Sequence, residues 1–226
     1  SRFGVRANKP PHEFDAVRRR KAGVQDEGSQ VVATTFFAAL SGAHSLLDTC
    51  AGPGGKAALL SRLSQENGIT FHAYEISPAR AELVKQVVTY GDVSIGDARE
   101  ITGSYDAIVS DVPCTGIGAL RRRPEVRWRR TPADLTNLLP LQLEIAQRAI
   151  ANLNPGGTLG YITCSPHLAE TRGAIENLLR KNSDLEELRV DTGIQNASSG
   201  KAMQLWTHRH NTDAMFLALL RKRATV

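Results

Sequence analysis

Cysteine is scarce in this 226-residue chain, which holds only Cys50, Cys114 and Cys164. An odd and widely spaced set argues against a disulfide framework, and the lack of any CxxC pair argues against a zinc site. No segment approaches the roughly 20 consecutive apolar residues of a membrane span, and the N-terminus has no signal-peptide core. We therefore expect a cytoplasmic protein with reduced thiols, no membrane segment and no metal.

Internal repeats and low-complexity linkers are also absent, and 41% hydrophobic with 23% charged residues is ordinary for a globular protein. The length suits one large α/β domain, which we expect to be monomeric. The first stretch is polar, with a basic cluster at residues 18–21, so we divide the chain into an arm, 1–28, and a domain, 29–226. A formal charge of +5 favours a polyanionic partner only weakly.

Apolar strand patterns alternate with helical patterns from Ser29 onward. The predicted strands are 45–48, 69–75, 93–95, 105–110, 158–163 and the terminal run 214–220, and residues 202–206 form a further apolar run. The predicted helices are 29–40, 56 onward, 78–88, 132–153 and 168–181, with a turn at 154–157. This alternation predicts βαβ units around a parallel sheet, with ligands at the carboxyl ends of the strands.

A glycine-rich turn, Asp48-Thr49-Cys50-Ala51-Gly52-Pro53-Gly54-Gly55-Lys56, joins the first strand to its helix. Glycines let the backbone approach a ligand closely, and the helix N-terminus offers free N–H groups. The segment is not a P-loop, because Cys50 stands where the first glycine belongs and Ala57 follows the lysine. It is not a dinucleotide fingerprint either, because the third glycine is missing. An acid followed by a tight glycine turn, DxxxGxG, remains.

Two more acids stand at later strand ends. Glu75 could accept both hydroxyls of a ribose, and Asp97 could accept from an adenine amino group. A lone acid at a strand end is more often a helix cap or a solvated charge. Together with Asp48 these two make three acids in the order that a nucleoside-binding site requires, which favours ligand binding over capping. Because the sequence has no phosphate-binding loop, the expected nucleoside ligand is S-adenosylmethionine.

Two cysteines and an aspartate lie at the ends of the next strands, in Asp111-Val112-Pro113-Cys114 and Thr163-Cys164-Ser165-Pro166. A thiolate added to carbon 6 of cytosine makes carbon 5 nucleophilic toward an electrophilic methyl group, and a base must then remove the carbon-5 proton. Either cysteine alone is more often a small buried hydrophobe. Both lie in turns beside proline, however, which favours function. The residues alone do not say which cysteine attacks.

Residues 121–130, which follow the turn that contains Cys114, include six arginines. Among them are Arg121, Arg122, Arg123 and Arg127, and Trp128 lies in the same run. Such a run is commonly a solvated face. Here it adjoins the expected base site, and the tryptophan could stack on a nucleobase, so we expect RNA contact. His208 and His210 have no neighbouring ligands that would complete a metal site.

The ordered motifs resemble those of the Fmu/Sun-type ribosomal RNA cytosine-C5 methyltransferases (NOL1/NOP2/Sun family). The matching segments are Gln25–Gln30, Cys50–Lys56, Glu75, Asp97, Asp111–Cys114, Thr163–Ser165 and Thr212–Phe216. The resemblance implies a Rossmann-like methyltransferase fold with a mainly parallel seven-stranded sheet and helices on both faces.

The same resemblance implies a role for each matching residue. Cys50, Ala51, Gly52, Pro53, Gly54, Gly55 and Lys56 would contact the methionine part of S-adenosylmethionine, Glu75 its ribose and Asp97 its adenine. Asp111 would lie between cofactor and target base, Cys164 would be the nucleophile, and Cys114 would assist product release. Two features depart from the family pattern. Asn211 replaces a glycine before Thr-Asp, and the helical RNA-binding domain typical of bacterial members is absent.

These features and the resemblance predict an S-adenosylmethionine-dependent RNA cytosine-C5 methyltransferase that acts on 16S ribosomal RNA through a covalent cysteine–cytosine intermediate. One alternative is an enzyme that acts on transfer RNA or DNA. Another is a non-catalytic RNA-binding assembly factor that keeps the fold. Intact Asp111, Cys114 and Cys164 count against the assembly factor, because a binding module need not keep a nucleophile.

Overall fold

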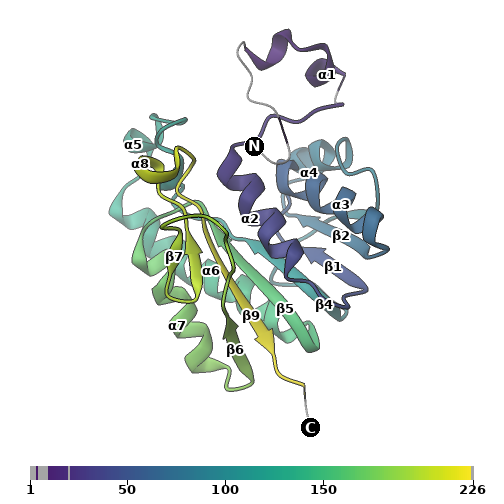
Figure 1. Ribbon diagram of the computed structural model, residues 1–226, viewed down its shortest axis with the longest axis vertical. Coiled ribbons are helices and arrows are strands. Elements are labelled where there is room, and N and C mark those ends of the chain that lie inside the picture. The colour runs from purple at the N-terminus through teal and green to yellow at the C-terminus, as the bar shows by residue number, and fades with distance from the viewer. Residues whose placement is uncertain (1–3, 5–9, 20, 225–226) are drawn as a thin grey trace.

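Five parallel strands form the centre of the sheet in the computed structural model, which describes residues 4, 10–19 and 21–224. In spatial order they are β3 (Asp92–Ile95), β2 (Thr70–Glu75), β1 (Ser45–Asp48), β4 (Tyr105–Asp111) and β5 (Leu153–Thr163). The antiparallel strand β9 (Phe216–Lys222) pairs with β5, and β6 (Leu185–Leu188) and β8 (Ala202–Gln204) both pair with β9. The predicted mainly parallel α/β sheet is therefore confirmed (Figure 1).

The strand number differs from the expected seven, because the sheet has nine strands within the described part of the chain. The short strand β7 (Ser198–Ser199) pairs with β8 as a hairpin. Gly200 occupies the left-handed region in the turn between them, with φ of 65°. A two-residue strand of serines has no apolar pattern, so the sequence did not reveal it.

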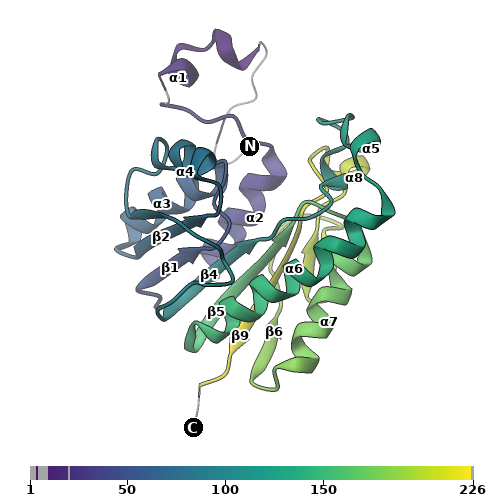
Figure 2. The same cartoon turned by 180° about the vertical axis from the view of Figure 1, so that it is seen from behind.

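Helices cover both faces of the sheet, as expected (Figures 1 and 2). They are α2 (Glu27–Ala38), α3 (Gly55–Asn67), α4 (Pro78–Lys85), α6 (Pro132–Ala151) and α7 (Arg172–Lys181). One apolar cluster includes residues of α2, α3 and α4, and the other includes residues of α6 and α7. Successive residues Leu46 and Leu47 of β1 belong to different clusters, because side chains alternate between the faces of a strand.

Helix α2 packs directly on β5 through a glycine. A Cβ atom at Gly160 would lie 2.4 Å from Cδ2 of Phe36, whose side chain is fully buried. Helix α2 starts at Glu27, two residues before the predicted start, because the Asp26 side chain accepts a hydrogen bond from Gly28 N. The expected domain boundary after residue 28 therefore falls inside a helix.

Two other predicted elements differ in detail. Residues 154–157 do not form a free turn but belong to β5, whose register against β4 shifts between Tyr105 and Ala107. The predicted helix 168–181 is a 3-10 turn, η3 (Leu168–Glu170), followed by α7, and Thr171 interrupts it with φ of −124° and ψ of −106°. A capping box formed by Thr131 and Asp134 begins α6, close to the predicted helix start at residue 132.

The basic arm contains a 3-10 turn, η1 (Pro11–Glu13), and a single helical turn, α1 (Asp15–Arg18). Figure 1 shows α1 beyond the carboxyl edge of the parallel strands. Asp15 forms ion pairs with Arg18 and Arg19, both exposed. Arg20 of the predicted basic cluster lies outside the described residues.

Candidate active site

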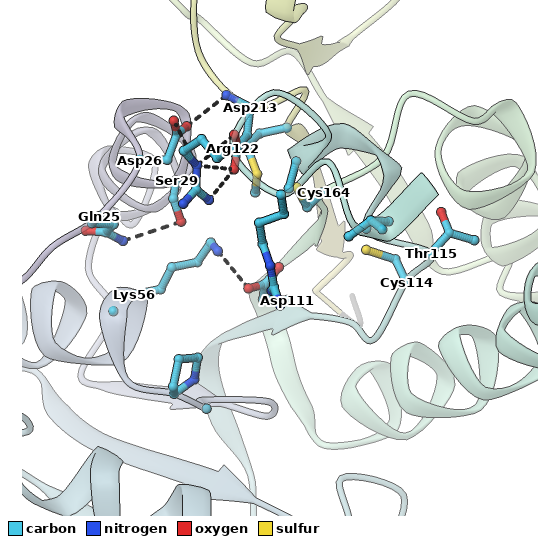
Figure 3. Close-up of a pocket in the computed structure, with 18 of the residues that line it drawn as sticks. Gln25, Asp26, Ser29, Lys56, Asp111, Cys114, Thr115, Arg122, Cys164 and Asp213 are labelled. Atoms are coloured by element: carbon cyan, nitrogen blue, oxygen red, sulfur yellow. Dashed lines mark hydrogen bonds and ion pairs between the residues drawn. The ribbon is translucent and has the colours of Figure 1, made fainter. Parts of the chain in front are cut away.

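A pocket of about 650 Å³ opens at the carboxyl ends of β1, β4 and β5 (Figure 3). This volume lies within the range of small-molecule sites. The lining includes most of the predicted cofactor loop together with the predicted base-site residues. These are Cys50, Ala51, Gly52, Pro53, Gly55, Lys56, Asp111, Cys114 and Cys164. The sequence-predicted residues from the ends of three strands therefore meet in one pocket.

The glycine-rich loop follows β1 and packs closely on its neighbours. A Cβ at Gly52 would lie 2.1 Å from Oε2 of Glu75, and Gly52 N donates to that oxygen at 3.0 Å. Gly54 has φ of 109°, and a Cβ there would lie 2.6 Å from Cγ2 of Val87. Gly54 is also the N-cap of α3 and provides no side-chain cap. The free N–H groups of the helix start are thus available to a ligand.

Three carboxylates, Asp48, Glu75 and Asp111, surround this loop. Burial raises the pKa of Asp48 from 3.8 to about 7, and the charges of Asp111 and Glu75 add to the shift. The hydrogen bond from Cys50 N and the charge of Lys56 oppose it. The three acids fit a cationic group such as a sulfonium better than a phosphate, whereas the uncapped helix start fits a carboxylate.

Lys56 of α3 and Asp111 of β4 form an ion pair across the pocket, with Nζ donating to Oδ2 at 2.7 Å. Burial alone would lower the pKa of Lys56, but the charge and hydrogen bond of Asp111 outweigh it and raise the pKa. Lys56 therefore stays protonated. The sequence placed Lys56 only in the cofactor loop, and its link to Asp111 emerges from the fold.

Burial raises the pKa of all three thiols in the described structure. The pKa of Cys114 rises to about 12, mainly by burial and further by the charges of Asp111 and Glu170. Burial also raises the pKa of Cys164, with contributions from Cys114, Asp213 and Asp111, while Lys56 lowers it in part. Burial thus favours the protonated form of both thiols at neutral pH.

The loops that carry the two cysteines are joined by backbone hydrogen bonds. Gly118, in the 3-10 turn η2 (Ile117–Ala119), donates to Cys164 O at 3.0 Å and accepts from Ala214 N at 2.9 Å. A Cβ at Gly118 would lie 2.4 Å from Ala214 O and 2.8 Å from Cys164 O. Only glycine permits this approach, which fixes the segment after Cys114 against Cys164.

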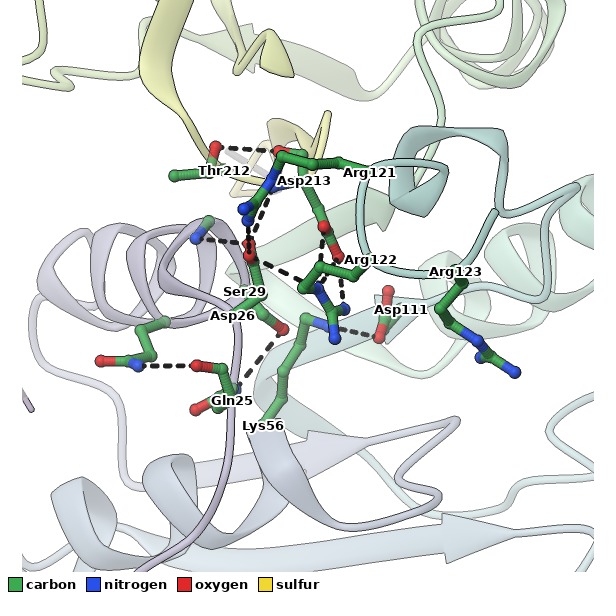
Figure 4. A network of polar contacts seen from close by, with 12 residues as sticks. Gln25, Asp26, Ser29, Lys56, Asp111, Arg121, Arg122, Arg123, Thr212 and Asp213 are labelled. Carbon is green, nitrogen blue, oxygen red and sulfur yellow. Dashed lines mark hydrogen bonds and ion pairs between the residues drawn. The ribbon is translucent and has the colours of Figure 1, made fainter. Parts of the chain in front are cut away.

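A second ionic cluster lies beside the pocket (Figure 4). Arg122 donates through Nε to Asp213 Oδ1 at 2.9 Å, and Asp26 lies within 3.5 Å of the same nitrogen. Arg121 pairs with Asp26 at 3.0 Å, and Asp26 also accepts from Asp213 N. Asp26 and Asp213 line the pocket and were missed as site residues. The signal was present, because both belong to segments that resemble the family motifs.

Three predicted cofactor residues, Gly54, Glu75 and Asp97, do not line this pocket. Glu75 is buried and accepts from Gly52 N and Ser77 N, and its Oε1 pairs with Arg80 at 2.6 Å. Asp97 follows β3 and is bound by Arg99 Nη2 at 2.6 Å. Hydrogen bonds from the Arg99 side chain and backbone lower the pKa of Asp97. Both acids lie at the carboxyl edge of the sheet, as predicted, but each already has partners.

The arginine run is divided between two environments. Arg121 and Arg122 are committed to Asp26 and Asp213. By contrast, Trp128 in α5 (Val126–Arg129) is 82% exposed, and the Arg127 guanidinium lies 5.3 Å from its ring centroid. Arg123 and Arg129 line the pocket. An exposed cation and aromatic ring therefore stand beside the entrance.

Within the described residues, no group of three or more histidine, cysteine, aspartate or glutamate side chains is arranged to hold a metal ion. No helix of this part of the chain has the length and apolarity to cross a bilayer. His210 is used structurally, because its Nδ1 accepts from Trp206 N at 2.8 Å.

Comparison with known proteins agrees with this geometry. A methyltransferase of Mycobacterium tuberculosis, MT1451, is 46% identical over 94% of the chain and 48% of its own length. The ribosomal RNA small subunit methyltransferase B of Shewanella oneidensis is 35% identical over 89% of the chain and 48% of its own length. The crystal structure of NSun6 from Pyrococcus horikoshii with SFG superposes with a TM-score of 0.83 and 26% identity, covering 96% of this chain and 57% of that one.

The chain thus spans about half the length of the curated relatives it matches, with 48% coverage in both cases. The sequence model of the 16S rRNA methyltransferase RsmB/F family matches residues 36–221, most of the chain. Family and fold together confirm S-adenosylmethionine as the cofactor. The chain belongs to the RsmB/F family of 16S rRNA methyltransferases.

Proposed function

We propose that this chain methylates carbon 5 of a cytosine in RNA, with small-subunit ribosomal RNA as the substrate and Cys164 as a covalent nucleophile. One observation carries the proposal: Cys164, Cys114 and Asp111 line the same pocket as the cofactor loop. Relatives named as small-subunit ribosomal RNA methyltransferases support the choice of RNA. Ribosomal RNA as substrate agrees with the cytoplasmic location expected from the sequence.

S-adenosylmethionine, when bound, supplies an electrophilic methyl group on a sulfonium. The loop Cys50–Lys56 and the start of α3 would hold its methionine part, and the nearby carboxylates favour its positive charge. Glu75 would accept from the ribose hydroxyls and Asp97 from the adenine amino group. Each carboxylate would then have to release its arginine, Arg80 or Arg99, or bind the arginine and the cofactor together. Ile76, which follows Glu75 and is 57% exposed, offers an apolar surface for the adenine ring.

The target cytosine must leave its stack to reach the pocket. Asp111 would accept from the exocyclic amino group. The Cys164 sulfur bonds to carbon 6 while its proton passes through the Asp111 carboxylate to ring nitrogen 3, which receives the displaced electron pair. Carbon 5 is then nucleophilic and takes the methyl group, whose bond to the sulfonium sulfur breaks.

Release of the product reverses the addition. A base removes the proton from carbon 5, the carbon 5–carbon 6 double bond re-forms, and the bond between Cys164 and carbon 6 breaks. Nitrogen 3 returns its proton through Asp111 to the Cys164 sulfur. The balance is one methyl gained and one proton lost by the cytosine. Cys114 is the candidate for the base because it lines the same pocket, and it must first give its own proton to solvent, since only the thiolate can accept the carbon-5 proton.

The surface around Trp128 would bind RNA next to the flipped base. Arg127 and Trp128 together can stack on a neighbouring base, while Arg123 and Arg129 can pair with phosphates. Arg121 and Arg122 would contribute less to RNA binding than the sequence suggested, because their charges are balanced by Asp26 and Asp213.

The experiment that tests the function is methyl transfer from radiolabelled cofactor to small-subunit ribosomal RNA, with bisulfite sequencing of the product. Wild-type chain should leave a bisulfite-resistant cytosine, and Cys164→Ala should not. Calorimetric binding of S-adenosylmethionine to Cys164→Ala is the control, because loss of methyl transfer in a variant that still binds the cofactor isolates the covalent step. Label on transfer RNA alone would favour the transfer RNA alternative. Cofactor binding without label on any RNA would favour the non-catalytic assembly factor.

A further inference from the structure

Glu170 is a carboxylate that the reaction just described does not use, although its side chain is completely buried. It lies at the end of η3, six residues after Cys164 along the chain. Within the described residues it has no ion pair with a lysine, arginine or histidine. A buried charge without a cation is costly unless hydrogen bonds satisfy it. Its position therefore calls for a reason beyond stability.

The carboxylate accepts three hydrogen bonds, all from groups that support the Cys114 loop. Thr115 donates to it twice, from N at 2.8 Å and from Oγ1 at 2.6 Å. Gln142 of α6 donates to it at 2.9 Å, and the same amide nitrogen donates to Pro113 O at 3.0 Å. Glu170 thus holds the residues on both sides of Cys114, one directly and one through Gln142.

The rest of this network is equally local. Tyr161 of β5 donates to Gln142 Oε1 at 3.2 Å and lies 3.3 Å from Glu170 O. Arg130 Nε donates to Thr115 O at 2.9 Å from the other side. The turn that brings Glu170 inward is closed by Ser165 Oγ, which accepts from His167 N at 3.1 Å.

Glu170 therefore links the chain segment of one cysteine to the loop of the other. Gly118 N, hydrogen-bonded to Cys164 O, closes the second connection. With both connections present, the Cys114 loop cannot move away from Cys164 without breaking charge-assisted hydrogen bonds, which are stronger than neutral ones.

We propose that Glu170 is a positioning residue that fixes Cys114 relative to Cys164 for removal of the carbon-5 proton. The role rests on the proposed covalent mechanism. Glu170 contacts neither substrate nor cofactor and acts through Thr115 and Gln142. Its loss slows the elimination step, not the attack or the methyl transfer.

A first experiment measures the geometry without any RNA, so that it does not depend on the proposed reaction. The rates of iodoacetamide alkylation of Cys50, Cys114 and Cys164 are followed by mass spectrometry in the full chain. Glu170→Gln keeps the volume but places an amide among three donors. It should speed alkylation of Cys114 by about tenfold, equivalent to about 1.4 kcal/mol, and leave Cys50 and Cys164 unchanged.

Thr115 offers a matched pair of variants that preserve the charge of Glu170. Thr115→Val removes the Oγ1 donor and should speed Cys114 alkylation, whereas Thr115→Ser keeps the hydroxyl and should behave as wild type. Glu176→Gln, an exposed glutamate of α7, is the control for loss of one negative charge. Faster alkylation of all three cysteines would show general loosening, and an unchanged Cys114 rate would show no positioning. Either result would overturn the proposal.

A second experiment places the effect in the reaction. In a denaturing gel with radiolabelled cofactor and small-subunit ribosomal RNA, Glu170→Gln should accumulate a methylated protein–RNA adduct that wild type resolves. Loss of turnover without an adduct, or wild-type turnover, would contradict the proposed role. If wild type itself labels no RNA, the proposed function fails, while the alkylation results still decide whether Glu170 positions Cys114.

Discussion

Lys56 Nζ lies 2.7 Å from Asp111 Oδ2, so the start of α3 and the end of β4 are joined at the centre of the pocket. One member belongs to the predicted cofactor loop and the other to the predicted base site. The pair therefore connects the two halves of the proposed reaction. Because both side chains are only partly buried, at 14% and 28% exposure, the ion pair can open when a ligand enters.

Replacement of Lys56 by methionine should leave Asp111 without its cation. We expect the free energy of unfolding to fall by about 1–2 kcal/mol, less than for a fully buried pair, because water screens part of the interaction. The rate of methyl transfer should also fall, by more than the loss of stability alone would cause, because Lys56 would no longer orient Asp111. Denaturant unfolding and single-turnover kinetics measure the two effects. Lys85→Met, an exposed lysine at the end of α4, is the control. Equal methyl-transfer rates for Lys56→Met and Lys85→Met would show that Lys56 has no role in the reaction.

Glu75→Gln should weaken binding of S-adenosylmethionine and of its demethylated product. The variant keeps the volume of the buried side chain but loses one acceptor for the ribose, which corresponds to about 1–3 kcal/mol. Calorimetry measures the affinity. A thermal unfolding curve distinguishes this loss from collapse of the loop that Glu75 also supports through Gly52 N. Unchanged affinity in a folded variant would exclude Glu75 from the ribose role.

Asp48 should make stability depend on pH. Burial raises its pKa from 3.8 to about 7, so the folded chain keeps a proton that the unfolded chain releases between those values. The contribution of Asp48 to stability is therefore full below about pH 4 and is lost as pH rises toward 7, a change on the order of 3–4 kcal/mol. Asp48→Asn should flatten this part of the profile in urea unfolding. Identical slopes for wild type and variant would show that Asp48 titrates normally.

The sequence predicted the fold well where the pattern is local. Leu46 and Leu47 mark a strand buried on both faces, and Thr131 with Asp134 marks a helix start. The differences occur where long-range contacts decide. Residues 154–157 look like a turn from their proline and glycines, but pairing with Tyr105 extends β5 through them. Thr171 carries no helix-breaking signal, yet the inward turn of Glu170 interrupts the helix there.

The site could be predicted as a set of residues but not as a set of contacts. Asp111, Cys114 and Cys164 were identified by their chemistry at strand ends, and they do line one pocket. The ion pairs of Arg121 and Arg122 with Asp26 and Asp213 join segments far apart in sequence. Only the folded chain shows that these arginines are already neutralised.

Replacement of Arg123 and Arg129 by alanine should weaken binding of single-stranded RNA without regard to sequence. Each lost phosphate contact should reduce the slope of log affinity against log salt by about 0.7. Trp128→Ala should cost about 1–3 kcal/mol through lost stacking while leaving that slope unchanged. Fluorescence anisotropy at several salt concentrations separates the two effects. Arg180→Ala, exposed on α7, is the control for lost charge. If the control changes binding equally, α5 is only a solvated surface.

Cys114→Ala should separate the two halves of the proposed reaction. Cys164 remains in the pocket beside Asp111 and Lys56, so attack on carbon 6 and methyl transfer can proceed. Without the Cys114 thiol, removal of the carbon-5 proton should slow, and a methylated protein–RNA adduct should accumulate that survives a denaturing gel. Cys164→Ala should give neither adduct nor product. The reverse pattern, with an adduct from Cys164→Ala and none from Cys114→Ala, would exchange the roles of the two cysteines. Full activity in both variants would rule out covalent catalysis by Cys164 and by Cys114, and Cys50 would be the one remaining thiol among the described residues that line the pocket.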